Sequence, residues 1–413
     1  MSSDLQSTTS EFAATTQAEL CRFLADNAAG ERRALLPVGG RTSLHYGNVS
    51  LKAETILATS GLTRVVDYPA RDMTITVEAG IRLDDLRTLL KSEGQQLPID
   101  IAQSQRAALG GAAATDTGGS RRLGYGTFRD YVIGLSAATA DGKLFHSGGR
   151  VVKNVAGYDM CKLLVGSMGT LAVITQLTLK LRPIPEKSAQ LWAAYRSFSD
   201  LDRALESMLR SAIRPVALDV LNPQAAEQIS AAARCDLPNR SPVLIVGVEG
   251  SAREVEWQID TLRRELGHIP PESTSVFDGA EVSRLWSALT EYQCSADDPL
   301  TFQAHLLPSR AMEFAEKATS LGVAVQVHAG TGTVIGHLPD DAATVERAEA
   351  IVSPLRNLAH NGRGNLVILD CDNLWKPQLS VFGPPTSQQG LMRRIKSAFD
   401  PDDLLNSGRF FAP

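Results

Sequence analysis

A glycine-rich turn stands about forty residues from the start of the chain, in the stretch LPVGGRTSL (36–44). Two adjacent glycines, Gly39 and Gly40, follow a short apolar run and precede three side chains that can form hydrogen bonds. Glycine lets a ligand approach the main chain closely, and consecutive exposed N–H groups form a concave nest for an anion. These residue types therefore predict a site that holds an anionic group through the backbone.

Three more glycine-rich turns follow, each beside a segment with strand character. They lie at Gly110-Gly111, at Gly118-Gly119 and between Gly166 and Gly169. Each turn alone is also compatible with a simple reversal of the chain. Four turns that converge on one elongated ligand would suit a dinucleotide between two small subdomains, because backbone N–H groups can offset the charge of a pyrophosphate.

Two common nucleotide-binding motifs are absent from the sequence. No G-x-x-x-x-G-K-[ST] run occurs, so the chain has no P-loop. The stretch nearest to G-x-G-x-x-G begins at Gly124 and carries Arg129 in the last position, and it opens no evident helix. The sequence therefore favours neither a P-loop kinase nor an NAD enzyme with a Rossmann fold.

The composition is that of an ordinary globular protein with more than one domain. The chain has 413 residues, of which 43% are hydrophobic and 21% charged, and this length predicts two or three domains. A net charge of −5 argues against nucleic acid as the partner. No apolar run approaches the roughly 18 residues of a membrane span, and the polar N-terminus lacks the features of a signal peptide. We therefore expect a cytoplasmic protein.

Five cysteines are spread through the chain without any C-x-x-C pair. This spacing argues against a disulfide framework and against an iron–sulfur cluster held by this chain alone. We interpret them as free thiols. They are Cys21, Cys161, Cys235, Cys294 and Cys371.

Hydrophobic periodicity predicts the elements that carry these turns. A helix over 16–29 leads to a short strand over 34–38 that runs into the first glycine turn. The glycine-rich stretch 107–126 is expected to be irregular, and Asp141-Gly142 is expected to form a hairpin turn. The other predicted segments are a strand over 73–80, a helix from Leu83, strands over 131–140 and 143–148, and a strand over 170–185 that prolines end.

Beyond these prolines the pattern changes to strands that alternate with helices. This alternation predicts an α+β domain in which helices cover one face of a single antiparallel sheet. The predicted strands are 191–198, 217–222, 241–250, 302–308, 323–329, 333–339 and 365–370. The predicted helices are 199–211, one after residue 222, 252–266, 309–320, 341–360 and one that begins at Met392.

Several stretches together resemble one flavoprotein family. LPVGGRTS resembles the pyrophosphate turn of the vanillyl-alcohol oxidase type of FAD domain. ALGGAAATDTGGSRRLGYG and DYVIGLSAATADG resemble its second FAD segment and the strand after it. VVKNVAGYDMCKLLVGSMGTLAVITQLTLKL resembles the third segment, and FDPDDLLNSGRF resembles the C-terminal tail. The matches span residues 35–182 and 391–410, in the family's order.

The resemblance implies an α+β architecture. A two-lobed FAD-binding domain of the vanillyl-alcohol oxidase type (PCMH-type) would be followed by an α+β cap domain with an antiparallel sheet. The FAD domain would span 1–182, with subdomains of about 1–58 and 59–182. The cap would span 183–390, and the segment 391–413 would return to the FAD domain.

The resemblance also implies that the chain binds FAD. Amides of the first glycine turn would hold the pyrophosphate, and the later segments would line the ribityl chain, the ring and the adenine. We expect non-covalent FAD, because Arg41 and Thr42 occupy the places where some family members carry a flavin-linking histidine. The residues expected to bind FAD are Val38, Gly39, Gly40, Arg41, Thr42, Ser43, Gly110, Gly111, Thr115, Asp116, Gly118, Gly119, Gly169, Ile174 and Asn406.

The chemistry implied is hydride transfer from a 2-hydroxy acid to the flavin, with a base that takes the hydroxyl proton. His305, His328 and His337 are the candidate bases, although a histidine in an alternating strand can equally be structural. Arg121 and Arg122 are candidates for the substrate carboxylate, with solvent-facing arginines as the alternative. No metal site is expected, because the residues after His328 lack the aspartate of a similar metal-binding motif.

Within the family, VVKNVAGYD and the Gly-Ser-Met-Gly-Thr run are similar to one FAD-binding subunit of bacterial glycolate oxidase (glycolate dehydrogenase), the one that accompanies the catalytic flavin subunit. The catalytic flavin subunit and related D-lactate dehydrogenases usually carry Glu where Met168 stands. This similarity implies a complex with a second FAD subunit and an iron–sulfur subunit, which could hold the chain peripherally at the inner membrane. Two other functions stay open: a flavin-carrying assembly subunit without turnover of its own, and an oxidase of another alcohol.

Overall fold

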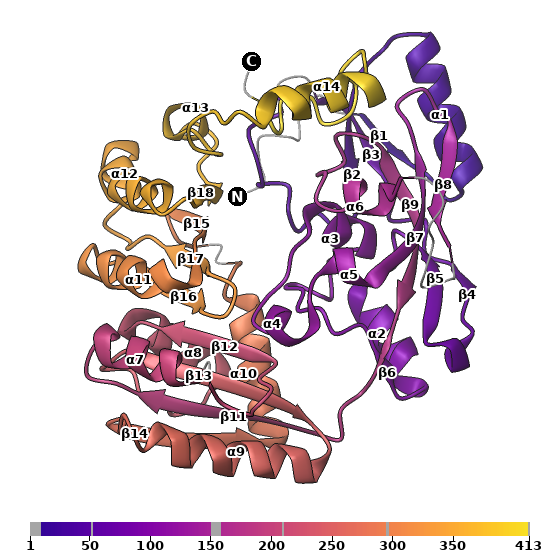
Figure 1. Ribbon diagram of the computed structural model, residues 1–413. Helices are drawn as coiled ribbons and strands as arrows, with labels where there is room; N and C mark the ends of the chain where they lie inside the picture. The colour runs from indigo at the N-terminus through magenta and orange to yellow at the C-terminus, as the bar shows by residue number, and fades with distance from the viewer. Residues whose placement is uncertain (1–9, 51–52, 150–157, 209, 295–296, 412–413) are drawn as a thin grey trace. The chain divides into compact units, whose positions relative to one another are not determined.

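The structure is a computed structural model in which helices and strands follow one another along the chain (Figure 1). It describes residues 10–50, 53–149, 158–208, 210–294 and 297–411. Residues 151–157 of VVKNVAGYD, a stretch on which the similarity to the accompanying glycolate oxidase subunit rests, lie outside the described residues.

The chain divides into two compact units. Their segments can be followed in Figure 1, where the colour changes with residue number. The predicted domain limits followed residues 182 and 390, whereas the units change at Ile184 and Gly383. The short segment Gly118–Gly126 also belongs to the second unit, although it lies within the predicted FAD domain. The first unit thus comprises the chain to Thr117, Thr127–Ile184 and the chain from Pro384, and the second comprises Gly118–Gly126 and Pro185–Gly383.

Two sheets build the first unit. A parallel sheet has the order β1-β3-β2, and an antiparallel sheet has the order β4-β5-β9-β7-β8. Their strands are β1 (Ser10–Ala13), β2 (Ala34–Val38), β3 (Ala53–Ala58), β4 (Val65–Asp67), β5 (Thr74–Glu78), β7 (Val132–Ala138), β8 (Leu144–Gly148) and β9 (Val173–Lys180). A separate pair is formed by β6 (Gln95–Gln96) and β10 (Arg182–Pro183). The helices are α1 (Gln17–Ala29), η1 (Ala70–Asp72), α2 (Leu83–Ser92), α3 (Leu109–Thr115), α5 (Phe128–Tyr131), α6 (Met160–Leu164) and α14 (Gln389–Phe399).

Local signals in the sequence account for several of these elements. Thr16 caps α1 by accepting a hydrogen bond from the amide of Glu19, and Leu20 and Leu24 bury one face of that helix. The predicted hairpin is confirmed, because β7 and β8 pair antiparallel around Asp141-Gly142. β2 ends at Val38, directly before the first glycine turn.

The prediction of an irregular stretch over 107–126 was wrong. Leu109–Thr115 forms helix α3 and Arg122–Tyr125 forms helix α4. A glycine inside a helix costs about 1 kcal/mol relative to alanine. At Gly110 close packing offsets that cost, because a Cβ there would lie 2.6 Å from the Cβ of Ala79. The packing partner is distant in sequence, so the sequence pattern alone could not reveal the helix.

One antiparallel sheet dominates the second unit, with the order β14-β11-β13-β12-β16-β17-β15-β18. The strands are β11 (Lys187–Ala194), β12 (Ala217–Leu221), β13 (Val243–Gly250), β14 (Ser273–Asp278), β15 (Leu300–His305), β16 (Ala324–His328), β17 (Thr333–His337) and β18 (Asn365–Cys371). The helices are α4 (Arg122–Tyr125), α7 (Phe198–Met208), α8 (Pro223–Ala233), α9 (Ala252–Leu266), α10 (Gly279–Glu291), η2 (Pro308–Arg310), α11 (Ala311–Ser320), α12 (Val345–Asn361) and α13 (Lys376–Leu379). The predicted α+β fold class is confirmed.

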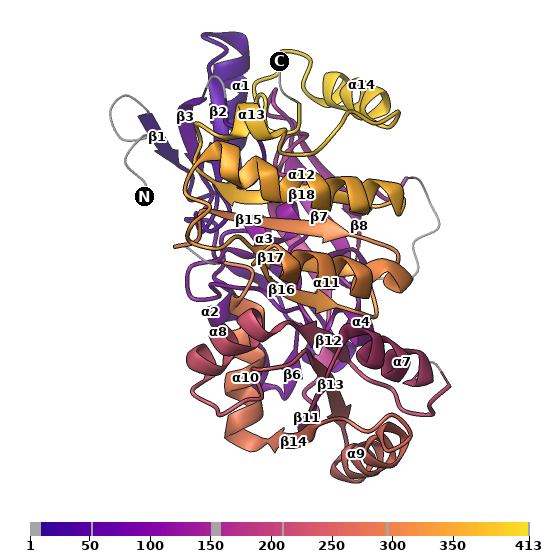
Figure 2. The same cartoon turned by 90° about the vertical axis from the view of Figure 1, so that its left-hand side faces the viewer.

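Helices cover this sheet on both faces, which corrects the prediction of one covered face. α7, α9, α11 and α12 pack into one core, and Figure 2 shows α11 and α12 lying across the sheet. α8 and α10 pack into a second core on the opposite face. The physical reason lies in β11 and β13, where successive residues such as Leu191 and Trp192 are both apolar and fully buried in different cores.

Candidate functional site

The first unit contains a cavity at the point where the first glycine turn leaves β2. Of the residues expected to bind FAD, all except Asp116, Gly118 and Gly119 line this cavity. Asp116 instead caps the C-terminus of α3 in a left-handed conformation, with φ 51°. Gly118 and Gly119 begin the segment that belongs to the second unit. The structure therefore brings most of the predicted cofactor residues together in one place.

The turn itself is shaped by close backbone contacts. A Cβ on Gly40 would lie 1.9 Å from the carbonyl oxygen of Arg106, so no larger residue fits there without a shift of the backbone. Arg41 follows in the left-handed region with φ 59°, and its guanidinium pairs with both carboxylate oxygens of Glu11 at 2.8 and 2.7 Å. The side chain of Arg41 is therefore held by β1, and its backbone faces the cavity.

The amides of this turn are available to a ligand. In the part of the chain that the structure describes, no N–H group of residues 39–43 donates a hydrogen bond. The amide of Gly111, in the first turn of α3, has no acceptor there either. Nothing lies within 4 Å of the position that a Cβ of Gly111 would occupy. Amides grouped in this way at a bend form an anion-binding nest.

The two glycines give a matched pair of predictions. Gly40→Ala is expected to destabilise the apoprotein by about 1–3 kcal/mol, because its methyl group meets a backbone oxygen. Gly111→Ala is expected to keep or raise apoprotein stability and still weaken FAD binding, because its methyl group projects into open space beside the cavity. Melting temperatures of the apoproteins and FAD titrations measure both effects. Equal stability losses in the two variants would contradict the view that Gly40 is packed against the backbone while Gly111 borders open space.

The C-terminal tail closes one side of the cavity. Asn406 lines it, with φ 47°, and donates from Nδ2 to the carbonyl oxygen of Met168 at 2.6 Å. The side-chain oxygen of Asn406 is buried and has no partner among the described residues. A buried acceptor without a donor is costly, so it is well placed for a hydrogen bond from a bound molecule.

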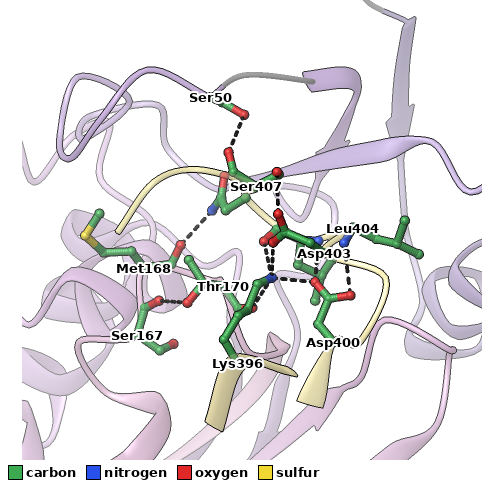
Figure 3. A network of polar contacts seen from close by, with 11 residues as sticks. Ser50, Ser167, Met168, Thr170, Lys396, Asp400, Asp403, Leu404 and Ser407 are labelled. Carbon is green, nitrogen blue, oxygen red and sulfur yellow. Dashed lines mark hydrogen bonds and ion pairs between the residues drawn. The ribbon is translucent and has the colours of Figure 1, made fainter. Parts of the chain in front are cut away.

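A partly buried lysine ties the C-terminal tail to the rest of the first unit (Figure 3). Lys396 of α14 contacts Asp400 Oδ2 at 2.5 Å and Asp403 Oδ1 at 3.1 Å. It also donates to the carbonyl oxygens of Thr170 and Leu405, each at 2.9 Å. The carboxylate of Asp400 also accepts hydrogen bonds from the backbone amides of Leu404 and Leu405, so several contacts hold the tail.

Arg409 places a buried cation at the cavity. It is 8% exposed and lines the cavity, and its Nη1 donates to the carbonyl oxygens of Leu44, Tyr46 and Asn48 at 2.8 to 3.2 Å. Burial lowers the pKa of the Arg409 guanidinium below its ordinary value. No carboxylate pairs with it in the described part of the chain. A buried charge of this kind is stabilised by an opposite charge, so an anion in the cavity would be its natural partner.

These features fit a dinucleotide with a pyrophosphate. The nest at residues 39–43 and the Arg409 cation both suit the phosphates, while Asn406 offers an acceptor. Sequence reasoning missed Arg409. The signal was present in the tail sequence NSGRF, directly after a glycine, but a single arginine near a chain end is usually solvated.

In the second unit, the segment Gly118–Gly126 lies against the sheet. The amide of Gly124 donates to the carbonyl oxygen of Val216 at 3.0 Å, and a Cβ on Gly124 would lie 2.6 Å from the Cα of Val216. Tyr125 donates its hydroxyl to Glu249 at 2.5 Å. The glycine therefore permits the close approach that fixes the segment.

The two predicted arginines in this segment have different surroundings. The Nη1 atom of Arg121 lies 3.3 Å from the buried carboxylate of Glu249, and its guanidinium lies 5.4 Å from the centre of the Trp286 ring. Arg121 thus helps to anchor the segment. The guanidinium of Arg122 makes no hydrogen bond or ion pair with any residue that the structure describes. Arg122 is therefore the better candidate for a substrate carboxylate.

Two of the predicted histidines stand in one row across four neighbouring strands. Asp219 on β12 pairs in register with His328 on β16, His328 pairs with Thr333 on β17, and Thr333 pairs with His305 on β15. Register partners in adjacent strands have neighbouring side chains on one face. The imidazole Nδ1 of His328 lies 2.8 Å from Asp219 Oδ1, and Nδ1 of His305 lies 3.5 Å from the Thr333 hydroxyl.

The electrostatics of this row favour a neutral imidazole. His305 ends β15 with its side chain at the surface, yet the chain around it desolvates the ring. This desolvation, followed by the electrostatic influence of Arg122 and then of His328, lowers the pKa of His305 below its ordinary value. A neutral imidazole can accept a proton.

The third predicted histidine stands apart from this row. His337 lies four residues beyond Thr333 on β17, is 2% exposed, and contacts Asp298 Oδ2 through Nδ1 at 2.8 Å. Its ring also packs edge-on against Tyr292, with 4.5 Å between the ring centres. This enclosure is typical of a structural histidine.

Comparison with known proteins decides the family. Residues 11–148 match the FAD binding domain, and residues 184–367 and 386–410 match the C-terminal domain of FAD linked oxidases. The chain belongs to the FAD-linked oxidases. Its cofactor is FAD, and it is an oxidoreductase, so the predicted cofactor, enzyme class and family resemblance are confirmed.

Several relatives are similar over almost the whole chain of this FAD-linked oxidase. Glycolate oxidase subunit GlcD of Bacillus subtilis is 27% identical over 92% of this chain and 84% of its own. D-2-hydroxyglutarate dehydrogenase of Xanthomonas citri is 28% identical over the same shares. D-lactate dehydrogenase of Anaerostipes hadrus is 30% identical over 90% of this chain and 83% of its own. The chain is therefore a GlcD-like FAD-binding protein of the group that these enzymes represent.

Solved structures show the same fold. p-Cresol methylhydroxylase aligns with a TM-score of 0.74 and 14% identity over 97% of this chain and 88% of its own. Alkyldihydroxyacetonephosphate synthase aligns with a TM-score of 0.69 and 16% identity, covering 96% of this chain and 75% of its own. These alignments confirm the predicted two-domain architecture of the PCMH-type FAD oxidases.

Because the cofactor is FAD, the cavity of this FAD-linked oxidase is the candidate FAD site. FAD would supply a hydride acceptor when bound, and the cavity residues that would hold it are the amides at 39–43 and Gly111, with Asn406 and Arg409 from the tail. Non-covalent attachment stays a prediction. The histidine just beyond the first glycine turn is His45, whose ring packs edge-on against Tyr46 with 4.8 Å between the ring centres.

Within the ranges given above, no three His, Cys, Asp or Glu side chains are grouped as metal ligands. In the same ranges, no helix combines the length and the apolar character that crossing a membrane requires.

Proposed function

We propose that this FAD-linked oxidase oxidises a small 2-hydroxy acid, such as glycolate, to the corresponding 2-oxo acid. The relatives named above include a glycolate oxidase subunit, a D-lactate dehydrogenase and a D-2-hydroxyglutarate dehydrogenase, and these names share a 2-hydroxy acid. The observation that carries the proposal is Arg122, a guanidinium without a partner in the described chain, whose charge acts on His305. This pairs a carboxylate ligand with a proton acceptor.

The roles follow from the chemistry of these side chains. Arg122 would bind the substrate carboxylate, because a guanidinium can form two parallel hydrogen bonds with it. The imidazoles of His305 and His328 would offer the acceptor for the hydroxyl proton. The carbon that bears the hydroxyl would lose its hydrogen as a hydride to the cofactor, so that one proton and one hydride leave the alcohol together.

Anaerobic mixing of the purified chain, reconstituted with FAD, tests the proposal. Glycolate, D-lactate and D-2-hydroxyglutarate are added separately, and the loss of the flavin's blue absorbance is followed. We expect bleaching by at least one of the three acids. Flavin that stays oxidised with all three would instead favour the flavin-carrying assembly subunit, and bleaching only by an alcohol without a carboxylate would favour an oxidase of another alcohol.

The lowered pKa of His305 predicts how the reduction rate depends on pH. Because the pKa lies below the ordinary value, the ring stays neutral at neutral pH, and the rate should fall only on acidification below about pH 6.5. The unfolded chain binds this proton more tightly than the folded protein, so the same shift makes stability fall as the pH drops through that range.

Arg122→Met supplies the matching variant. It removes one cause of the shift, so the acid limb of the reduction rate should move to higher pH. It should also raise KM for the acid about 10- to 100-fold, because a hydrogen bond to a charged group contributes about 1.5–3 kcal/mol. Arg121→Met, whose guanidinium is paired with Glu249, is the control and should leave the acid limb in place. An unchanged limb in Arg122→Met would contradict this role.

We propose further that the chain works as the accompanying FAD-binding subunit of a glycolate oxidase complex, with a second FAD subunit and an iron–sulfur subunit. The absence of any C-x-x-C pair in its own sequence supports the idea that electrons leave through a partner. Affinity purification from the native organism tests this proposal. Recovery of a second flavoprotein together with a cysteine-rich cluster protein is expected, and recovery of the chain alone would count against it.

A further inference from the structure

We infer that Glu11 is a positioning residue for FAD: it holds the side chain of Arg41 and so keeps the backbone of Arg41 in the conformation that leaves its amide available to the cavity. The inference concerns the binding of FAD and does not depend on which 2-hydroxy acid is oxidised. It can therefore fail while the proposed function stands.

The first step is the backbone conformation of Arg41. Arg41 lines the cavity, and its φ of 59° lies in the left-handed region. A side chain disfavours this region because its Cβ atom crowds the following carbonyl oxygen, whereas glycine adopts it freely. Two glycines precede Arg41, yet the turn carries a side chain at the left-handed position itself. A compensating contact is therefore expected there.

The second step is the contact that the structure shows. Nη2 of Arg41 donates to both carboxylate oxygens of Glu11, at 2.8 and 2.7 Å. Because φ is the rotation about the N–Cα bond, it sets the direction of a side chain relative to its own N–H group. A guanidinium held by Glu11 therefore restricts how the amide of Arg41 can turn. Among the residues that the structure describes, this amide has no acceptor, so it is available to an anion.

The third step is the strand that presents Glu11. β1 pairs with β3 along its whole length, and β3 separates β1 from β2, the strand that leads into the glycine turn. On one side of Glu11, the ring of Phe12 stacks on Phe23 of α1 with 4.1 Å between the ring centres. On the other side, Ser10 Oγ lies 2.8 Å from Thr55 Oγ1. Glu11 is therefore anchored independently of the turn that it holds.

The exposure and the charge of the pair distinguish positioning from simpler roles. The side chains of Glu11 and Arg41 are each 44% exposed, and an exposed ion pair adds little to the stability of a fold. A carboxylate near an anion site also repels the phosphates of FAD. A pure charge effect would make FAD bind more tightly when Glu11 is neutralised, whereas loss of positioning would make it bind more weakly. The sign of the change decides between them.

Glu11→Gln in the full chain gives the first test. Calorimetric titration of the apoprotein should show FAD binding about two- to fivefold weaker, the range that an exposed ion pair supports, with an apoprotein melting temperature close to that of the unchanged protein. Glu31→Gln is the matched control. It neutralises another exposed acid that pairs with an arginine, Arg33, and neither of these residues lines the cavity, so FAD affinity should not change.

Two substitutions of Arg41 give the second test, because both remove its charge and only one keeps a Cβ atom. Arg41→Gly should bind FAD about five- to tenfold more tightly than Arg41→Ala, since glycine alone adopts the left-handed conformation without cost. Adding Glu11→Gln to Arg41→Gly should have no further effect. Arg32 is the control position: its φ is 51°, it pairs with Asp402, and it does not line the cavity. Arg32→Gly and Arg32→Ala should bind FAD equally well.

The outcomes are distinct. Tighter binding of FAD by Glu11→Gln would overturn the inference and show a charge effect in its place. Equal losses in Arg41→Gly and Arg41→Ala would overturn it as well, because the guanidinium itself would then hold the cofactor. Either result leaves the proposed oxidation of a 2-hydroxy acid standing, since bleaching of the flavin in the unchanged protein tests that function. Weaker binding by Glu11→Gln that disappears in the Arg41→Gly background supports the inference.

Discussion

Replacing Lys396 with methionine is expected to destabilise the first unit by about 3–5 kcal/mol, because breaking a buried ion pair leaves an uncompensated charge. The side chain of Asp400 is 0% exposed and that of Lys396 is 13% exposed. Lys396 also holds the carbonyl oxygens of Thr170 and Leu405, so the variant loses two further hydrogen bonds. The tail that carries Asn406 and Arg409 to the cavity should then detach at lower temperature.

Flavin fluorescence during heating measures this effect, because it reports the release of FAD from the unit that binds it. Arg394→Met on the same helix is the control, since Arg394 is exposed and a surface change of this kind usually stays within about 0.5 kcal/mol. Similar release temperatures for the Lys396 and Arg394 variants would show that the tail is held by other contacts.

Replacing Arg409 with methionine is expected to lower FAD affinity by about 2–5 kcal/mol, roughly 30- to 5,000-fold, the cost of removing one partner of a buried charge pair. The reason is that Arg409 is the buried cation of the cavity, with no carboxylate partner in the described chain. Calorimetric titration of the apoprotein with FAD measures the loss, and Arg409→Lys should recover part of it.

Riboflavin, which lacks phosphate, separates charge from shape. Arg409 also holds the carbonyl oxygens of Leu44, Tyr46 and Asn48, so the variant could act by loosening that loop. A charge effect on the phosphates predicts a large loss for FAD and little for riboflavin. Equal losses for both ligands would mean that the loop contacts alone explain the variant.

Much of the candidate cofactor site could be predicted because a bend with available amides is a local feature of the chain. Gly39 and Gly40 follow β2 directly, and a bend with free amides is a property of a few consecutive residues. The second element of the cavity, α3, was missed as a helix because its glycine is tolerated only through contact with Ala79. Local pattern and long-range packing gave opposite indications there, and packing prevailed.

The candidate substrate residues could not be told apart from local sequence. His305, His328 and His337 have similar surroundings in the sequence, each within an alternating strand. Strand pairing alone places His328 beside Asp219 and puts His337 in an enclosed cluster. Arg121 and Arg122 are neighbours in sequence, yet the first is paired with Glu249 and the second has no ion-pair partner among the residues that the structure describes.

The sequence by itself determined the glycine bend expected to hold an anionic group, because a bend depends on a few consecutive residue types, and its resemblance to a known family indicated the FAD cofactor. The tertiary structure alone decided which charges stand at the cavity and which imidazole receives an acid partner. Asp219 lies 109 residues from His328, and Arg409 lies 365 residues from the carbonyl oxygen of Leu44. Contacts at such separations are set by how strands align and how the tail folds back, and no local pattern encodes them.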